Sequence, residues 1–326
     1  MKSRTKYLLI SGFVLLIFII IPFLGVIDLD MSNLFSNNPD SFIFWQLRLP
    51  RTIMAFIVGS SLALGGLIFQ NIFKNSLATP YTLGVSSGAA AGTVAALKLN
   101  LVLSIFGINF IYIAGFLGGI LSILLILGIT RITKSYSVYT ILMSGVAINF
   151  FFSAFILLLQ YMVDITQTVS VLRWLMGSIS ISGYRDILVI FPVWVFFVSA
   201  ALLLNKELVM ISGGENFAET RGLDVKKFRI LLFIIVSIIT GMIVSITGPI
   251  GFIGLIVPHI SRQFVKDDFR FLVILTVVFG GILLAVADLL ARILIPPAEI
   301  PVGVITSFFG APFFLFILIS SLRKKI

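Results

Sequence analysis

Cysteine is absent from this chain of 326 residues, and histidine occurs only once, at His259. Without cysteine the chain can form no disulfide, no thiolate metal site and no cysteine nucleophile. A single imidazole could bind iron or haem, but without cysteine, tyrosine or carboxylate neighbours it is a poor site for a hard ferric ion. We therefore expect no metal and no cofactor bound by this chain, and we expect His259 to pack near the end of a short helix.

Charge is also scarce. Charged residues make up 11% of the sequence, whereas hydrophobic residues make up 59% and the mean hydropathy is +1.18. Such a composition excludes a soluble globular protein and predicts a polytopic membrane protein. The net charge of +10 comes from basic residues scattered between apolar runs and not from one patch, which argues against a nucleic-acid partner.

The apolar runs predict an all-α fold with about ten transmembrane helices in one membrane domain over residues 1–326. The candidate spans are 7–26, 52–73, 83–97, 108–130, 138–162, 187–204, 228–247, 250–265, 271–292 and 303–322. The runs beginning at Leu83 and Pro249 are short for a bilayer, which predicts broken or partly buried helices. The first run resembles a signal peptide, but no small-residue cleavage site follows it, so we expect it to be retained.

Most Lys and Arg residues flank alternate ends of these spans, as the positive-inside rule requires. This pattern places both termini and the segment 205–229 in the cytoplasm. Gly- and Pro-rich stretches follow the second and seventh spans, at 75–88 and 248–251. Inverted repeats of five helices are one interpretation of this pairing. The glycine pairs at 65–66, 118–119 and 280–281 predict close helix contacts.

The segment 205–229 is the only long polar interruption, and it carries charges of both signs. Each charge would cost about 2.5–3.5 kcal/mol at the bilayer centre, so the segment must project into water. Its glycines predict a break at 213–214, a short helix from Glu215 to Arg221 and a stop at Gly222. Asp224 is placed to cap a helix that begins at Val225. A docking surface and a simple solvated connector are both compatible with this pattern.

The sequence gives little support to two other classes of function, a secondary transporter and an enzyme. A proton-coupled secondary transporter usually needs ionisable residues deep in the membrane, and the central parts of the apolar runs contain none. Sodium sites built from backbone carbonyls stay open. The sequence also has no HExxH motif, serine nucleophile elbow or GxxxxGK[ST] phosphate loop, so we expect neither an enzyme nor an ATP site in this chain.

Short motifs along nearly the whole chain resemble one family. They are LRLPR at 47–51, LALGG at 62–66, NSLATP at 75–80, LGVSSGA at 83–89, GVA at 145–147, WLMG at 174–177, GFIGLIVPH at 251–259, AD at 287–288, EIPVG at 299–303 and GAP at 310–312. In this order they resemble the FecCD family, the permease subunits of ATP-binding-cassette importers for iron-siderophores, haem and cobalamin.

The resemblance implies a multi-pass subunit of the cell membrane that pairs with a second copy or a paralogue. It implies a cytoplasmic ATPase that holds ATP and Mg, and an external substrate-binding protein. The implied substrate is an iron(III) chelate, either a siderophore or haem. Cobalamin or an oxyanion carried by the same machinery is the alternative, and a secondary transporter is a weaker one.

The resemblance also implies three groups of site residues. The ATPase-coupling residues would be Gly214, Glu215, Phe217, Ala218, Glu219, Arg221 and Gly222. The binding-protein docking residues would be Arg48, Arg51 and Arg292, and a translocation gate would include Ser86 and Ser87. Arg48 and Arg51 are three residues apart, so a helix beginning near Pro50 would put them on one face. The alternatives are ion pairs with Asp28, Asp30, Asp288 or Glu299 for the arginines, and helix capping for the serines.

Overall fold

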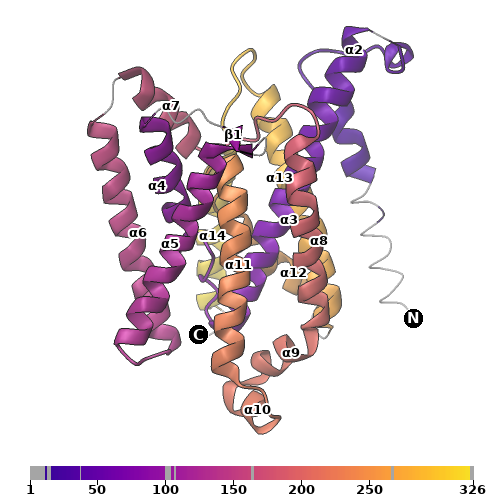
Figure 1. The fold of residues 1–326 in the computed structure, drawn as a ribbon. Coiled ribbons are helices and arrows are strands. Elements are labelled where there is room, and N and C mark those ends of the chain that lie inside the picture. Colours follow the sequence, from indigo (N-terminus) through magenta and orange to yellow (C-terminus); the bar gives the residue numbers. More distant parts are fainter. Residues whose placement is uncertain are drawn as a thin grey trace. The chain divides into compact units, whose positions relative to one another are not determined.

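The computed structural model describes residues 12, 16–36, 38–99, 104–105, 108–162, 165–265 and 268–323. Within these residues the elements are helices, apart from two antiparallel strands of two residues each, β1 (Ser104–Ile105) and β2 (Ile108–Asn109). The predicted all-α class is confirmed (Figure 1). The predicted span 7–26 lies partly outside the described residues; its residues 16–20 are helical and continue into η1 (Ile21–Phe23).

Every predicted span from 52–73 onward coincides with a helix. These helices are α3 (Leu49–Ile72), α4 (Val85–Lys98), α5 (Phe110–Ile132), α6 (Val138–Tyr161), α8 (Arg185–Leu203), α11 (Val225–Thr247), α12 (Ile253–Phe264), α13 (Phe269–Ile293) and α14 (Val302–Arg323). Among the described residues, six helical segments are long and apolar enough to cross a membrane. The two runs expected to be short form α4 and α12, with 14 and 12 residues.

The remaining elements are short, and most of them were not predicted from the sequence. They are η2 (Met31–Asn33), α2 (Pro39–Phe42), the π-helical η3 (Ile43–Arg48), α7 (Ile165–Leu175), α9 (Asn205–Gly213) and α10 (Glu215–Thr220). In η2, Asp30 caps the helix by accepting hydrogen bonds from Ser32, and these bonds lower the pKa of the Asp30 carboxyl.

The helices form two compact units that interleave along the chain. The first comprises Met1–Leu64, Ile179–Val195 and Gly251–Ile326, and in it α13 packs against α12 and α14. The second comprises Gly65–Ser178 and Phe196–Ile250, and in it α4, α5, α6 and α11 pack together. Two of the four boundaries fall inside α3 and α8, and the other two fall at 178–179 and 250–251. A single permease domain over 1–326 stays a prediction.

Glycines bring α4 and α5 into backbone contact in the second unit. A Cβ atom at Gly118 of α5 would lie 2.2 Å from the carbonyl oxygen of Gly88 in α4, and one at Gly92 would lie 2.1 Å from that of Ala114. Because carbonyl oxygens on helices cannot swing away as side chains can, these positions exclude any Cβ without separating the helices. The predicted close contact at Gly118 is confirmed.

We expect Gly118→Ala to lower the stability of the chain by about 1–3 kcal/mol, the usual cost of overpacking. Gly128 is the matched control because it lies on the same helix and a Cβ there meets nothing within 4 Å. Gly128→Ala should be neutral or stabilising by about 0.5–1 kcal/mol, because alanine restricts the unfolded chain. Thermal unfolding of both variants in the same detergent measures the difference, and equal melting temperatures would contradict the packing argument.

Candidate functional site

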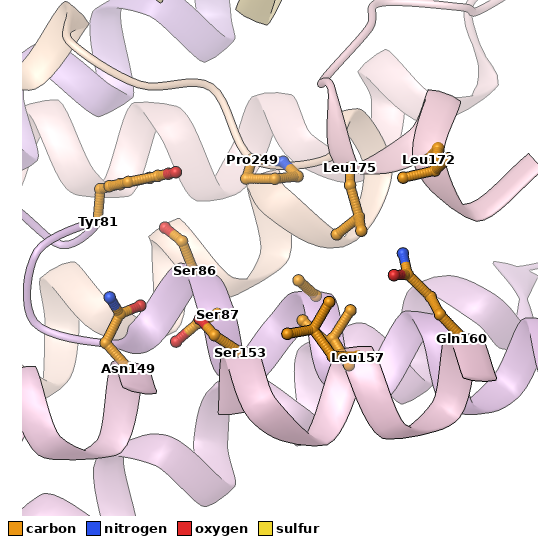
Figure 2. A pocket seen from close by; sticks show the side chains of 12 residues that line it. Tyr81, Ser86, Ser87, Asn149, Ser153, Leu157, Gln160, Leu172, Leu175 and Pro249 are labelled. Carbon is orange, nitrogen blue, oxygen red and sulfur yellow. The ribbon is translucent and has the colours of Figure 1, made fainter. Parts of the chain in front are cut away.

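A cavity of about 430 Å³ lies in the second unit, among α4, α6, α7 and two connecting segments (Figure 2). Its lining residues are Tyr81, Ser86, Ser87, Ala90, Asn149, Ser153, Ile156, Leu157, Gln160, Leu172, Leu175 and Pro249. The structure thus brings both predicted gate serines, Ser86 and Ser87, to one cavity. Their role as a gate stays a prediction.

The first turn of α4 sets the position of these serines. Gly84 precedes the helix with φ +80°, a left-handed conformation that favours glycine, and a Cβ there would lie 2.9 Å from the carbonyl oxygen of Gly145. Ser87 Oγ donates to the Gly84 carbonyl at 2.9 Å, and Ser122 Oγ of α5 donates to the same oxygen at 2.8 Å. Ser87 therefore binds the backbone of the first turn while it also lines the cavity.

Three polar residues of α6 in the cavity wall were not singled out from the sequence. Asn149, Ser153 and Gln160 recur at intervals of three or four residues, counting Leu157 between them, so they share one face of the helix. That spacing is the signal that could have identified them. Figure 2 shows their side chains directed into the cavity, opposite Leu175 and Pro249.

The polar segment 205–229 is folded, as its glycines and charges predict. Gly214 (φ +132°) separates α9 from α10, which ends at Thr220, one residue earlier than expected, and Gly222 has φ +85°. Asp224 caps α11 by accepting a hydrogen bond from the Lys227 backbone N–H at 3.0 Å. This bond, together with the Lys227 side chain, lowers the pKa of the Asp224 carboxyl.

Two contacts tie α10 to the membrane helices of the second unit. The guanidinium of Arg229 in α11 pairs with Glu215 at 2.5 Å and donates through Nε to the carbonyl oxygen of Ile72, the last residue of α3, at 3.1 Å. Ala218 is buried. On the outer side of α10, Phe217 is 43% exposed and stacks with the Arg221 guanidinium at 4.5 Å. Of the predicted coupling residues, Glu215 pairs with Arg229 and Ala218 is buried, so these two anchor α10. The exposed Phe217 side chain contacts Arg221 instead.

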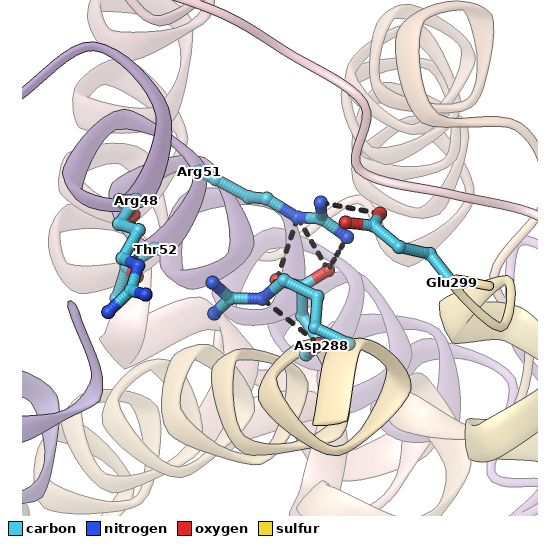
Figure 3. A network of polar contacts seen from close by, with 6 residues as sticks. Arg48, Arg51, Thr52, Asp288 and Glu299 are labelled. Carbon is cyan, nitrogen blue, oxygen red and sulfur yellow. Dashed lines mark hydrogen bonds and ion pairs between the residues drawn. The ribbon is translucent and has the colours of Figure 1, made fainter. Parts of the chain in front are cut away.

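In the first unit, Arg48 and Arg51 leave their helix in different directions (Figure 3). The regular α-helix α3 begins at Leu49, near Pro50 as expected, but helical backbone already runs from Pro39 through the π-helical η3. The wider π-helical turn η3 directly precedes Pro50, where a regular α-helix would lose a hydrogen bond and clash with the proline ring. Arg48 is buried and donates to the carbonyl oxygens of Phe23 and Ile27. The predicted common face of Arg48 and Arg51 is therefore wrong.

Arg51 forms a buried ion network with residues far away in the sequence (Figure 3). Its Nε and Nη2 atoms lie 3.0–3.1 Å from the carboxylate of Asp288 in α13, and Nη1 lies 2.8 Å from Glu299. The Asp288 side chain is only 1% exposed, whereas that of Glu299 is 55% exposed. The bidentate geometry suits a guanidinium and a carboxylate removed from water.

Arg292 binds the same carboxylate from one helical turn further along α13. Its Nε lies 3.3 Å from Asp288 Oδ2, and its Nη2 has no hydrogen-bond partner among the described residues. Two of the three predicted docking arginines thus make the intramolecular pairs that were the alternative to docking, and Arg48 binds backbone carbonyls. Docking of an external protein by these arginines stays a prediction.

The described residues show no evident metal site. They contain no group of three or more His, Cys, Asp or Glu side chains that could hold an ion. His259 lies within α12, and packing stays the prediction for its role.

The apolar helices and the folded polar segment define a multi-pass all-α membrane protein. The chain belongs to the FecCD transport family, whose model matches residues 13–320. It is 32% identical over 334 residues to the hemin transport system permease protein HmuU of Yersinia pestis, covering 100% of this chain and 99% of that protein. It is 37% identical over 277 residues to the cobalamin import system permease protein BtuC of Halobacterium salinarum, covering 85% and 73%.

A solved structure described as an inward-facing conformation of a transporter assigned to the metal-chelate ABC type superposes with a TM-score of 0.84. That chain is 30% identical, and the match covers 95% of this chain and 99% of the other. These similarities confirm that the chain is a permease and not an enzyme.

The ion network generates a prediction about stability. Asp288→Asn should destabilise the chain by about 3–5 kcal/mol, because it leaves the buried guanidinium of Arg292 without a negative partner and leaves Arg51 with only the exposed Glu299. Glu299→Gln is the matched control, and it should cost less than about 1 kcal/mol because Glu299 is largely exposed. Thermal unfolding in detergent compares them, and similar melting temperatures for the two variants would show that the network does not stabilise the fold.

Proposed function

We propose that this chain is the membrane-spanning subunit of an ATP-driven importer that takes up an iron(III) chelate, a siderophore or haem, delivered by an external binding protein. The observation that carries the proposal is the family match over residues 13–320. The hemin permease that aligns along the whole chain and the metal-chelate type neighbour support iron. A cobalamin importer is the second candidate, favoured by the similarity to a cobalamin permease.

On the cytoplasmic side, we propose that α10 contacts a separate ATPase, which would hold the ATP and Mg. The predicted coupling residues lie between two apolar helices in a folded segment of mixed charge. Movement of α10 would reach α11 through the Glu215–Arg229 pair and the end of α3 through the bond from Arg229 to the Ile72 carbonyl. The positive-inside pattern supports a cytoplasmic position for this segment and for both termini.

On the external side, Arg51 is the arginine best placed to meet a docked protein. Its Nη1 is held by Glu299, the one exposed carboxylate of the network. A carboxylate of the binding protein would compete with Glu299 for this guanidinium. Asp288 would stay buried and bound to the opposite side of the Arg51 guanidinium.

Uptake measurements test the proposed function. Cells that express the chain with its ATPase and binding protein should accumulate a radiolabelled ferric siderophore or haem, and cells without the chain should not. Uptake should stop when ATP is depleted and persist when proton and sodium gradients are collapsed. Accumulation of cobalamin alone would favour the second candidate, and loss of uptake with the ion gradients would indicate a secondary transporter.

The coupling proposal predicts a specific effect of Phe217. Phe217→Ala should weaken co-purification of the ATPase about tenfold or more, since exposed aromatic anchors often dominate protein interfaces. Val209→Ala is the matched control, because Val209 on α9 is 44% exposed but lies outside residues 214–222. Replacement of residues 214–221 by a Gly/Ser linker should abolish co-purification. Undiminished ATPase binding by the linker variant would refute the coupling role.

A further inference from the structure

The turn between α5 and α6, residues 133–137, lies at the same end of the second unit as α10 (Figure 1). An open pocket of about 540 Å³ is lined by residues of this turn and the first turn of α6, together with residues of α10 and the start of α11. Lys226 of α11 reaches the turn, where its Nζ lies 3.8 Å from the centre of the Tyr136 ring. An ammonium group this close to an aromatic face is attracted to it. The contact therefore joins the polar segment 205–229 to the turn.

Hydrogen bonds hold the turn at both of its ends. Lys134 has a left-handed backbone with φ +50°, and its N–H donates to a carbonyl oxygen in the last turn of α5 at 3.2 Å. Ser137 caps α6 by accepting from the Thr140 backbone N–H at 3.1 Å. The Thr140 hydroxyl also forms hydrogen bonds with the hydroxyls of Ser135 at 2.9 Å and Ser137 at 2.8 Å. Because the turn is short and bonded in this way, a displacement of Tyr136 would displace the first turn of α6 as well.

Lys226 is fixed to α10 through the first turn of α11. It is the second residue of that helix and follows Val225, which is buried. Arg229, one residue short of a full turn later, pairs with Glu215 of α10. A movement of α10 would therefore carry Lys226 with it.

The helix α6 connects the turn to the cavity of about 430 Å³. Asn149 in the cavity wall lies about 17 Å along the helix axis from Val138, the first residue of α6. The helix contains no proline that would kink it between these positions. A shift or rotation of its first turn would therefore also move the face that carries Asn149, Ser153 and Gln160.

We propose that Tyr136 and Lys226 are positioning residues that transmit the movement of α10 to α6, and so to the wall of the cavity. The inference rests on the proposed function and adds a route to those through α11 and the end of α3. Both side chains are needed, because the ring belongs to the turn and the ammonium belongs to α11. Without their contact, the open pocket would let α10 move without displacing the turn.

The number of chelate molecules taken up per ATP hydrolysed tests this transmission. It is measured in proteoliposomes that contain the chain, its ATPase and its binding protein, with a radiolabelled ferric siderophore or haem, whichever wild type accumulates. Tyr136→Ala and Lys226→Met should each lower this ratio about three- to fivefold, the effect of removing one cation–π contact that carries coupling. Tyr136→Phe keeps the aromatic face and should retain the wild-type ratio. The double variant should lie no lower than either single variant, because both remove the same contact.

Lys227→Met and Tyr139→Ala are the matched controls. Lys227 neighbours Lys226 and carries the same charge, but its side chain is 85% exposed and pairs with Asp224. Tyr139 follows the turn on α6 and is 72% exposed. Both controls should retain the wild-type ratio. A contact that only stabilised the fold would lower the melting temperature and leave the ratio unchanged.

Three results would overturn the transmission: a wild-type ratio in Tyr136→Ala or Lys226→Met, additive losses in the double variant, or loss of ATPase co-purification in either single variant. The last result would show that these residues contact the ATPase directly. Absence of ATP-driven uptake of any iron chelate by wild type would instead overturn the proposed function.

Discussion

The cost of placing charge among apolar helices constrains every part of this protein. A charged group in such a chain must project into water or pair with an opposite charge, or the position must carry an uncharged residue. The chain uses all three solutions. The charges of 205–229 lie in α9, α10, the start of α11 and their connections. Asp288 is buried between two guanidinium groups, and the cavity beside α6 has no charged lining residue. Each candidate functional surface therefore exposes its charged residues to water, pairs them with opposite charges or contains none.

The helices and their ends were largely predictable because the signals for them are local. Long apolar runs predict spans, and every predicted span from 52–73 onward is helical. Around 205–229 the sequence also predicts caps and breaks. Gly214 and Gly222 have positive φ angles, and Asp224 binds the backbone of Lys227, because glycine and aspartate have distinct backbone preferences that neighbours do not override.

The geometry of the arginines was not predictable, since it depends on contacts remote in sequence. A three-residue spacing placed Arg48 and Arg51 on one face, but Arg51 pairs with Asp288, 237 residues away, and Arg48 binds carbonyl groups near the first helix. Pro50 favours a widened turn before it, but the local sequence does not show which partner each arginine reaches. The cavity shows the same limit. Asn149, Ser153 and Gln160 share a face by spacing, but only the packing of α4 against α6 and α7 makes that face a cavity wall.

An uncharged cavity also bears on how transport is driven. If the cavity beside α6 belongs to the transport path, its lining offers no acidic or basic side chain that could couple chelate movement to a proton gradient. Its lining also contains no carboxylate, imidazole or thiolate that could bind a bare metal ion. In the proposed importer, the energy would enter through a part of the chain that moves in response to the ATPase. In the second unit, α10 is suited to this role, since Arg229 joins it to both α11 and the end of α3 by bonds that a displacement of Glu215 would strain or break.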